Sequence, residues 1–299
     1  MKVRASARND VHGWVVLDKP AGMTSTHAVS RLKRIFNAKK AGHAGTLDPL
    51  ATGVLPVAFG EATKTVPFVQ DGEKVYCFTV RWGAETDTGD SDGRVAAHSN
   101  ARPAAAGILA LLPRFTGNIQ QQPPAYSAIK INGERAYDLA RGGQAPLLPP
   151  RHVTIHALDL INARPDEAIF EARCGKGTYV RAIARDLGRC LGCYGHVSAL
   201  RRTRVGPFRE TDAVTLPDLD DDVSCAQALR RVEAGLMALP RVMVDRDAAA
   251  KLRRGQPILL RGHVPFDGFA YAACCGVVIA VGAVENGELI PGRVFNLPL

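Results

Sequence analysis

The spacing of hydrophobic residues predicts an amphipathic helix near the start of the chain. Between Val29 and Phe36 the apolar positions recur at helical spacing, whereas lysine and arginine fill most of the other positions. Thr24, Ser25 and Thr26, just before this segment, are residues of the type that caps a helix N-terminus. We therefore expect a helix with an apolar inner side and a basic outer side.

Further along the chain, short apolar or alternating runs predict strands, and helical spacing predicts further helices. The expected strands are residues 15–17, 54–59, 74–82, 126–131, 153–162 and 168–174. The expected helices are residues 61–68, 103–112, 134–141, 179–191, 226–239 and 246–254. Because strands and helices are mixed without a regular βαβ alternation, we predict an α+β fold with a mixed, largely antiparallel central sheet and flanking helices.

The texture of the sequence changes after Pro240, where short predicted strands punctuated by glycine follow one another. A chain of 299 residues suits one large domain and one small one. We therefore predict a large domain over residues 1–240 and a small β-rich domain over residues 241–299.

Positive charge exceeds negative charge by 9 at pH 7, and it is clustered. Residues 31–43 hold five lysines and arginines and no acid, and residues 173–204 hold eight against one acid. Such patches favour a polyanionic partner, because binding to phosphates releases counterions. The alternative is a set of solvated basic faces. Two separate patches point to RNA or DNA.

The cysteines and the apolar runs exclude several classes of protein. Seven cysteines, an odd number, argue against a disulfide framework. Cys190 and Cys193 form a C-x-x-C pair, but with His196 they still leave a tetrahedral zinc site one ligand short, so we expect no metal. No apolar run is long enough to span a membrane, and residues 1–6 lack a signal core, so we expect a cytoplasmic protein without a membrane partner.

Residues 42–53, GHAGTLDPLATG, are the strongest candidate for chemistry. Pro49 biases Asp48 away from helical backbone angles, and the glycines on both sides allow a ligand or a second chain segment to approach closely. An acid on a rigid loop among apolar neighbours suits nucleophilic or acid–base chemistry. Taken alone, Asp-Pro in a glycine-rich loop is also typical of a plain turn.

Four segments in the same order carry a family resemblance. Residues 42–64, GHAGTLDPLATGVLPVAFGEATK, resemble the catalytic segment of the TruB-type tRNA pseudouridine synthases. Residues 17–25, LDKPAGMTS, are similar to the N-terminal KPxGxTS segment of that family. Residues 175–181, GKGTYVR, and 200–203, LRRT, are similar to its TYxR and LRRT segments. Together they span about residues 14–208. Tyr194 departs from the small residue expected before His196, which puts the packing there in doubt.

The resemblance implies an isomerase that converts uridine 55 in the T arm of tRNA to pseudouridine. It implies that Asp48 is the catalytic carboxylate, that Arg181 pairs with it, and that Tyr76 stacks on the flipped-out target base. The remaining pocket or substrate-contact residues that it implies are Lys19, His43, Tyr179 and Leu200. Since the reaction changes no oxidation state and loses no group, we expect no cofactor.

The resemblance also bears on partners and on the end of the chain. It implies tRNA as the partner rather than DNA, an RNA-binding loop over about residues 129–151, and a short PUA-like RNA-binding domain over residues 241–299. This loop and the short tail favour a stand-alone enzyme over a relative that needs a guide RNA. No long apolar seam suggests an obligate dimer, so we expect a monomer.

The residues themselves leave simpler interpretations open. Tyr76 could be an ordinary strand tyrosine, and Arg181 a surface phosphate binder. Lys19 could be a solvated lysine beside a turn, and His43 a structural histidine. The basic residues of 201–204 suit phosphate contacts. A non-catalytic tRNA-binding module with the same fold is the competing function.

Overall fold

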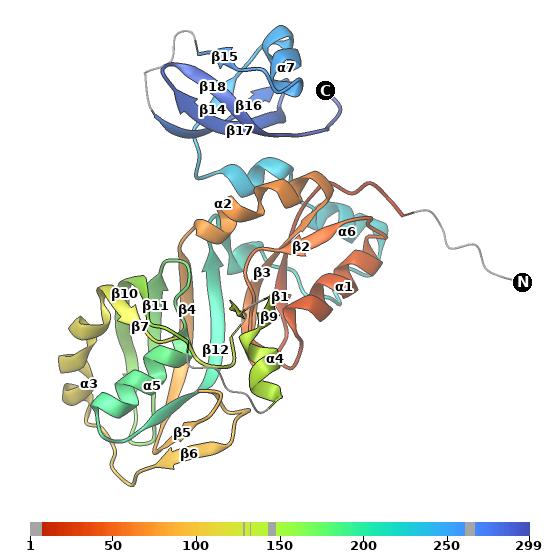
Figure 1. Ribbon diagram of the computed structural model, residues 1–299. Helices are drawn as coiled ribbons and strands as arrows, with labels where there is room; N and C mark the ends of the chain where they lie inside the picture. Colours follow the sequence, from red (N-terminus) through yellow and green to blue (C-terminus); the bar gives the residue numbers. More distant parts are fainter. Residues whose placement is uncertain (1–7, 128, 132, 143–147, 261–266) are drawn as a thin grey trace, which may run out of the picture.

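The structure is a computed structural model that describes residues 8–127, 129–131, 133–142, 148–260 and 267–299. A large sheet runs through the body of the molecule, and a smaller β-rich domain formed by the C-terminal residues sits at one end of it (Figure 1). The predicted α+β fold with a C-terminal β-rich domain is confirmed.

The central sheet brings distant segments side by side. Its strand order is β1 (Gly13–Lys19), β3 (Thr52–Phe59), β12 (Gly195–Val205), β4 (Lys74–Trp82), β11 (Glu167–Cys174), β10 (Arg151–Ala163) and β7 (Gly117–Gln121). Two short strands extend it, β2 (Ala41–His43) beside β3 and β13 (Phe208–Arg209) beside β12. Among the described strands β12 pairs with β3 in parallel, and the other pairs of this sheet are antiparallel, as predicted.

Helix α1 (Ser25–Ile35) has the predicted amphipathic form. The side chain of Thr24 accepts a hydrogen bond from the His27 amide at 3.1 Å and so caps the helix. Ala28 and Leu32 are buried against the core, whereas Arg31 and Arg34 are exposed. The basic outer face predicted from the sequence is therefore confirmed.

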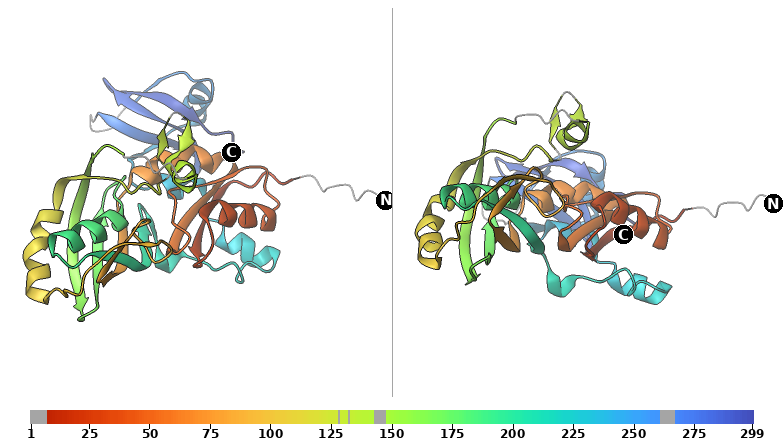
Figure 2. Two further views of the ribbon diagram at one scale, coloured as in Figure 1. Left: turned by 60° about the horizontal axis from the view of Figure 1, so that its bottom comes forward. Right: turned by 90° about the horizontal axis from the view of Figure 1, so that it is seen from below.

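The other helices and short elements surround the sheet. The α-helices are α2 (Val66–Asp71), α3 (Ala105–Leu111), α4 (Ala136–Arg141), α5 (Val180–Cys190), α6 (Asp222–Ala228) and α7 (Arg246–Arg253). The 3-10 helices are η1 (Gly60–Thr65), η2 (Leu112–Phe115), η3 (Glu210–Asp212) and η4 (Val232–Leu236). Two hairpins complete the body, β5 (Ala84–Thr86) with β6 (Val95–His98), and β8 (Lys130–Ile131) with β9 (Glu134–Arg135). Figure 2 shows α4 and its hairpin standing out from the face of the sheet.

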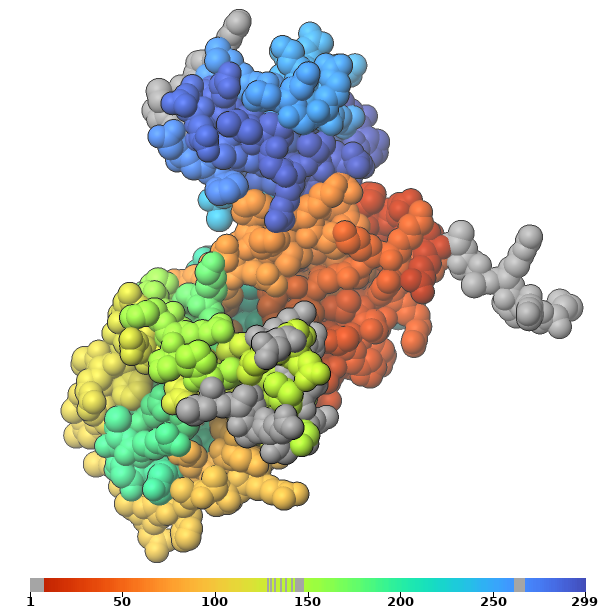
Figure 3. Space-filling model, in the orientation of Figure 1, coloured from red at the N-terminus to blue at the C-terminus, as the bar shows by residue number. Residues whose placement is uncertain are grey.

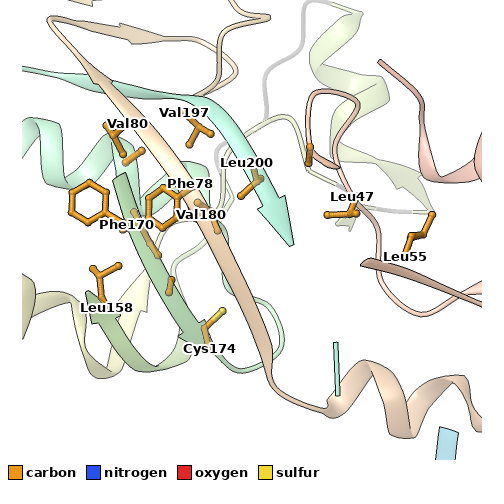
Figure 4. Close-up of a cluster of buried hydrophobic side chains, with 14 of the residues drawn as sticks. Leu47, Leu55, Phe78, Val80, Leu158, Phe170, Cys174, Val180, Val197 and Leu200 are labelled. Carbon is orange, nitrogen blue, oxygen red and sulfur yellow. The ribbon is translucent and has the colours of Figure 1, made fainter. Parts of the chain in front are cut away.

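The main core lies between the sheet and helices α1, α3 and α5. Phe78 of β4 stacks on Phe170 of β11 with ring centroids 5.4 Å apart (Figure 4). Val180 begins α5, and Leu200 lies within β12. Both side chains belong to the same buried cluster. This packing fixes the ends of β4, β12 and α5 relative to one another.

The C-terminal sheet is joined to the body through an apolar interface. Its order is β14 (Arg241–Met243), β16 (Gly268–Cys274), β17 (Val277–Glu285), β18 (Glu288–Val294) and β15 (Ile258–Leu259). Tyr271 and Phe295 pack in one buried cluster with Trp14 of the body. The ammonium of Lys64 also donates to the Val294 carbonyl at 2.7 Å. The domain boundary near residue 240 stays a prediction, although the second sheet begins at Arg241.

Some sequence predictions differ from the structure, and a central strand was missed. The strand expected over 126–131 is limited to β8, and residue 128 lies outside the described residues. The helix expected over 226–239 is wrong, because the backbone of Arg230 exchanges two hydrogen bonds with Trp14 and interrupts it. Strand β12 was not predicted, since its polar C-terminal half acquires strand geometry by pairing with β3 and β4.

Two further observations concern the backbone of Tyr194 and the length of the helices. Tyr194 adopts a positive φ of 55°, a left-handed conformation that glycine adopts at lower cost. No described helix combines the length and the apolarity needed to cross a bilayer.

Candidate active site

A cavity of about 650 Å³ opens where the ends of several elements meet. Its walls come from the loop after β2, the start of β4, the approach to α5 and the middle of β12. The predicted residues that line it are His43, Asp48, Tyr76, Tyr179, Arg181 and Leu200. The fold thus gathers six of the seven predicted site residues around one hollow.

Asp48 is held in place by contacts on both sides of it. The hydroxyl of Ser25 accepts a hydrogen bond from the Leu47 amide at 2.8 Å and donates one to the Leu47 carbonyl at 3.0 Å. On the other side, the Pro49 carbonyl accepts from the amide of Gly22 at 2.8 Å. Residues 17–25, which are similar to the KPxGxTS segment, therefore fix the loop that carries the carboxylate.

Arg181 meets Asp48 with two parallel contacts. Its Nε lies 2.9 Å from Asp48 Oδ2, and its Nη2 donates to Oδ1 at 3.1 Å. The side chain of Arg181 is 6% exposed and that of Asp48 is 32% exposed, so the carboxylate faces the cavity and the guanidinium lies behind it. Such a bidentate pair fixes the orientation of the acid.

Other groups hold Arg181 itself. Its Nη1 donates to the Thr88 carbonyl at 2.8 Å, and its Nη2 to the Tyr126 carbonyl at 2.8 Å. Asp90 Oδ2 lies 3.6 Å from Nη1, so a second carboxylate faces the same guanidinium. Asp90, Thr88 and Tyr126 were not found from the sequence. For Thr88 and Asp90, the available signal was the acidic, glycine-rich sequence of residues 83–93, GAETDTGDSDG.

Two opposing effects act on the ionisation of Asp48. Burial raises the pKa of Asp48 above 3.8, because a carboxylate loses hydration there, whereas the charge of Arg181 lowers it. Asp90 raises the pKa of Asp48 further, and Lys19 lowers it. The net direction is upward, so the acid titrates closer to neutral pH than an exposed aspartate.

Lys19 lies behind the Asp48 loop rather than on the cavity wall. The residue is fully buried, and its ammonium donates to the carbonyls of Met23 at 2.7 Å, Pro20 at 2.9 Å and Pro49 at 3.2 Å. Burial lowers the pKa of Lys19 to about 8, against the opposing charge of Asp48. The solvated lysine suggested as an alternative is therefore wrong, whereas a substrate contact at Lys19 stays a prediction.

The remaining predicted residues lie on the cavity wall. Tyr76 lies in β4 with its side chain partly exposed, and Leu200 is buried in β12. Tyr179 precedes α5, and its backbone amide and carbonyl both bond to the buried side chain of Gln121 at 2.8 and 3.1 Å. His43 ends β2 beside the loop. Gln121 was not found from the sequence.

The first two arginines of the basic run after Leu200 bond to groups within the protein. Arg201 forms ion pairs with Asp18 at 2.8 Å and with Glu210, and Arg202 is 1% exposed. The phosphate contacts expected for these two residues are therefore wrong, because both guanidiniums are engaged within the protein. Elsewhere His196 Nδ1 lies 2.9 Å from the Ala84 carbonyl, and Cys193 is buried.

The segment over residues 129–151 lies beside the cavity. Its described parts include the β8–β9 hairpin and α4, while residues 132 and 143–147 fall outside the described residues. Figure 3 shows the described parts crossing the face of the molecule between the α1 side and the α5 side. Tyr126 and Tyr137, with ring centroids 5.9 Å apart, line the cavity there.

The fold and this site define an enzyme of the pseudouridylate synthase class. Residues 33–180 match the model described as TruB family pseudouridylate synthase, N-terminal domain. Residues 181–249 match that of the tRNA pseudouridylate synthase B C-terminal domain. The chain belongs to the TruB family of pseudouridylate synthases, which are isomerases.

Curated relatives support this membership. The protein called tRNA pseudouridine synthase B of Bradyrhizobium diazoefficiens is 60% identical over 97% of this chain and 87% of its own length. That of Rhodopseudomonas palustris is 60% identical over 97% of this chain and 82% of its own length. That of Rhizobium meliloti is 52% identical over 95% of this chain and 96% of its own length.

Solved structures share the fold. A chain of a Cbf5–Nop10–Gar1 complex superposes with a TM-score of 0.74 at 26% identity, over 95% of this chain and 84% of that one. A chain of an H/ACA RNP bound to a substrate RNA containing 2′-deoxyuridine gives a TM-score of 0.75 at 23% identity. The match covers 96% of this chain and 86% of that one. At that identity the second likeness concerns the fold alone.

Proposed function

We propose that this protein isomerises uridine 55 in the T arm of tRNA to pseudouridine, with Asp48 as the catalytic carboxylate. The observation that carries the proposal is the bidentate Asp48–Arg181 pair on the floor of a cavity that Tyr76 also lines. Relatives up to 60% identical are named tRNA pseudouridine synthase B. The resemblance of residues 42–64 supports the assignment of the aspartate and of the T-arm uridine.

The target base must leave its stack to reach Asp48. Flipping a nucleotide out of a folded RNA costs roughly a few kcal/mol, and stacking on an aromatic ring returns about 1–3 kcal/mol. The Tyr76 ring, on the wall of the same cavity as Asp48, supplies that stacking surface. His43, Tyr179 and Leu200 complete the wall around the nucleotide.

The reaction then rearranges bonds within the nucleotide. The C1′–N1 bond of the uridine breaks, the uracil turns, and C5 bonds to C1′, after which the C5 proton leaves and N1 gains a proton. An ionised Asp48 assists by attack on C1′, by attack on the base or as the acceptor of a proton. Arg181 keeps the acid ionised and oriented in each case.

Charge and architecture support a stand-alone tRNA enzyme. The exposed basic face of α1 suits phosphate contacts. The segment 129–151 beside the cavity suits closure on the T arm, and residues 241–299 suit a PUA-like RNA-binding domain after a catalytic domain over 1–240. The 60% identity to relatives named as tRNA enzymes, against 26% to a chain of the Cbf5 complex, favours action without a guide RNA. We propose that the protein acts as a monomer.

The test is an incubation of purified protein with an unmodified tRNA transcript, without cofactor or guide RNA, followed by mapping of pseudouridine by mass. We expect modification at position 55. Asp48→Asn and Asp48→Ala should abolish it while tRNA binding persists, whereas Asp166→Asn, at an exposed acid paired with Arg102, should leave it unchanged.

The outcomes separate the competing functions. A protein that binds tRNA but forms no pseudouridine is the non-catalytic module. Modification that requires an added guide RNA would assign the protein to the guided type. Turnover retained in Asp48→Asn would remove Asp48 from its role without removing the activity.

A further inference from the structure

Arg202 is a fully buried arginine that the proposed chemistry does not use. It is 1% exposed, yet it lies in the wall of the cavity that holds Asp48. Within the described part of the chain, no acid forms an ion pair with it. A buried charge is costly unless hydrogen bonds compensate it, and the groups that bond to Arg202 indicate what it positions.

The guanidinium of Arg202 bonds to both ends of the loop that carries Asp48. Its Nη2 donates to the Gly45 carbonyl at 3.1 Å and its Nη1 to the Thr46 carbonyl at 3.3 Å, two to three residues before the acid. Its Nε donates to the Val54 carbonyl at 2.9 Å, after the loop has returned to the sheet. One planar group thus closes the loop at its start and at its end.

The backbone of Arg202 adds a second constraint on the same loop. Gly53, in β3, is its register partner in the parallel β3–β12 pair. A Cβ on Gly53 would lie 2.3 Å from the Arg202 carbonyl oxygen, so the two chains are in close contact there. Gly53 also has a positive φ of 97°, which favours glycine.

On its other side, Arg202 faces the aromatic wall of the cavity. Tyr76 is its cross-strand partner in the antiparallel β12–β4 pair. Burial raises the pKa of the Tyr76 phenol, and the charge of the adjacent Arg202 guanidinium lowers it. The same guanidinium therefore contacts the loop of Asp48 and the side chain of Tyr76.

We infer that Arg202 is a positioning residue of this site. It fixes the Asp48 loop against the strand that carries Tyr76, so that the carboxylate and the ring face a flipped nucleotide at a set separation. The inference rests on the proposed function of these two residues. It predicts that a change at Arg202 slows the chemical step while RNA binding, which depends mainly on phosphate contacts at the surface, is retained.

Substitution of Arg202 by lysine tests this role, because lysine keeps the positive charge but lacks the planar guanidinium with its several N–H donors. A single ammonium cannot reach three divergent carbonyls and the Tyr76 hydroxyl with the geometry of a guanidinium. For Arg202→Lys we expect the single-turnover rate of pseudouridine formation to fall about 100-fold, as displacement of a reacting group by about 1 Å produces. The dissociation constant for tRNA should change by less than about threefold.

Arg201→Lys is the matched control. Arg201 is the neighbouring residue, and its ion pairs with Asp18 and Glu210 are partly exposed. The same chemical change there should alter the single-turnover rate by less than about twofold, since partly exposed ion pairs contribute little. A rate for Arg202→Lys within about threefold of wild type would overturn the inference, and so would a rate loss matched by an equal loss of tRNA affinity.

Tyr76→Phe keeps the test decisive if Arg202→Lys does not fold. It retains the ring and removes only the hydroxyl that Arg202 contacts, so we expect about tenfold slower single turnover with unchanged tRNA affinity. When both variants fold, the single-turnover rate of the double variant should fall by less than the product of the two fold-reductions in the single variants. An unchanged rate in Tyr76→Phe, or fully multiplicative losses, would contradict the inference. Wild-type protein that forms no pseudouridine at all would instead contradict the proposed function.

Discussion

Arg181 contacts both carboxylate oxygens of Asp48, at 2.9 and 3.1 Å, although 133 positions separate the two residues in the sequence. The guanidinium is almost fully buried, whereas the carboxylate faces the cavity. The pair therefore couples the ionisation of Asp48 to an interior charge, and this coupling has consequences for pH dependence and for stability.

The rate should depend on pH through Asp48. Because burial raises the pKa of Asp48 and the proposed chemistry needs its ionised form, activity should be lost as pH falls through that raised pKa. Single-turnover rates measured between about pH 4 and pH 8 should show this acid limb above the range of an ordinary aspartate. A rate that stays constant down to about pH 4 would show that the ionisation of Asp48 does not limit the reaction.

Arg181→Met should move this limb to still higher pH, because the guanidinium is the largest influence that lowers the pKa of Asp48. We expect the rate at neutral pH to fall by at least about 100-fold, since the acid also loses its orientation. Arg181→Lys should retain part of the shift in pH dependence and little of the orientation. An acid limb that stays in place in Arg181→Met would argue against the coupling.

The stability of Asp48→Asn should differ from that of most buried substitutions. The folded-state pKa of Asp48 lies above its unfolded value of 3.8, so the folded protein binds this proton more tightly than the unfolded chain. Ionised Asp48 therefore costs stability at pH above its folded pKa, and that cost disappears as pH falls below both values. We expect a Tm for Asp48→Asn at or above that of wild type at pH 7, with the difference shrinking in acid. A clearly lower Tm at pH 7 would contradict this sign.

Gly53→Ala should destabilise the protein more than another glycine change with a similar backbone angle. Left-handed geometry costs a non-glycine residue about 1–2 kcal/mol, and forcing apart the β3–β12 contact adds about 1–3 kcal/mol. Gly255→Ala, where φ is 78° and no atom would lie within 4 Å of the new Cβ, should show the first cost alone. Denaturant unfolding of both variants measures the difference, and equal losses would contradict the close contact.

The basic face of α1 should contribute to tRNA affinity. Arg31→Glu and Arg34→Glu, both at exposed positions, should weaken tRNA binding without changing which uridine reacts. Each lost phosphate contact should also reduce the slope of log affinity against log salt concentration by about 1. Binding titrations across salt concentrations measure this slope, and an affinity that is insensitive to salt in the wild type would exclude these contacts.

Local pattern sufficed for much of the fold. The spacing around Leu32 and the cap at Thr24 predicted α1, and the alternation of residues 74–82 predicted β4 with its bounds. Helix 226–239 failed for a tertiary reason, because Arg230 pairs with Trp14 in β1, and a Cβ on Gly235 would lie within 3 Å of Thr65 and Trp14. Helical spacing in a short window carries no information about such distant partners.

The sequence by itself determined the loop that presents Asp48, because glycine and proline set backbone angles locally. It also determined the family, through four ordered segments. Only the tertiary structure decided that Lys19 lies behind that loop, that Asp90 faces Arg181, and that Arg202 is buried against three carbonyls. The position of a long cationic side chain depends on burial and on hydrogen-bond acceptors supplied by distant segments, and these exist only once the sheet has brought β3, β12 and β4 together.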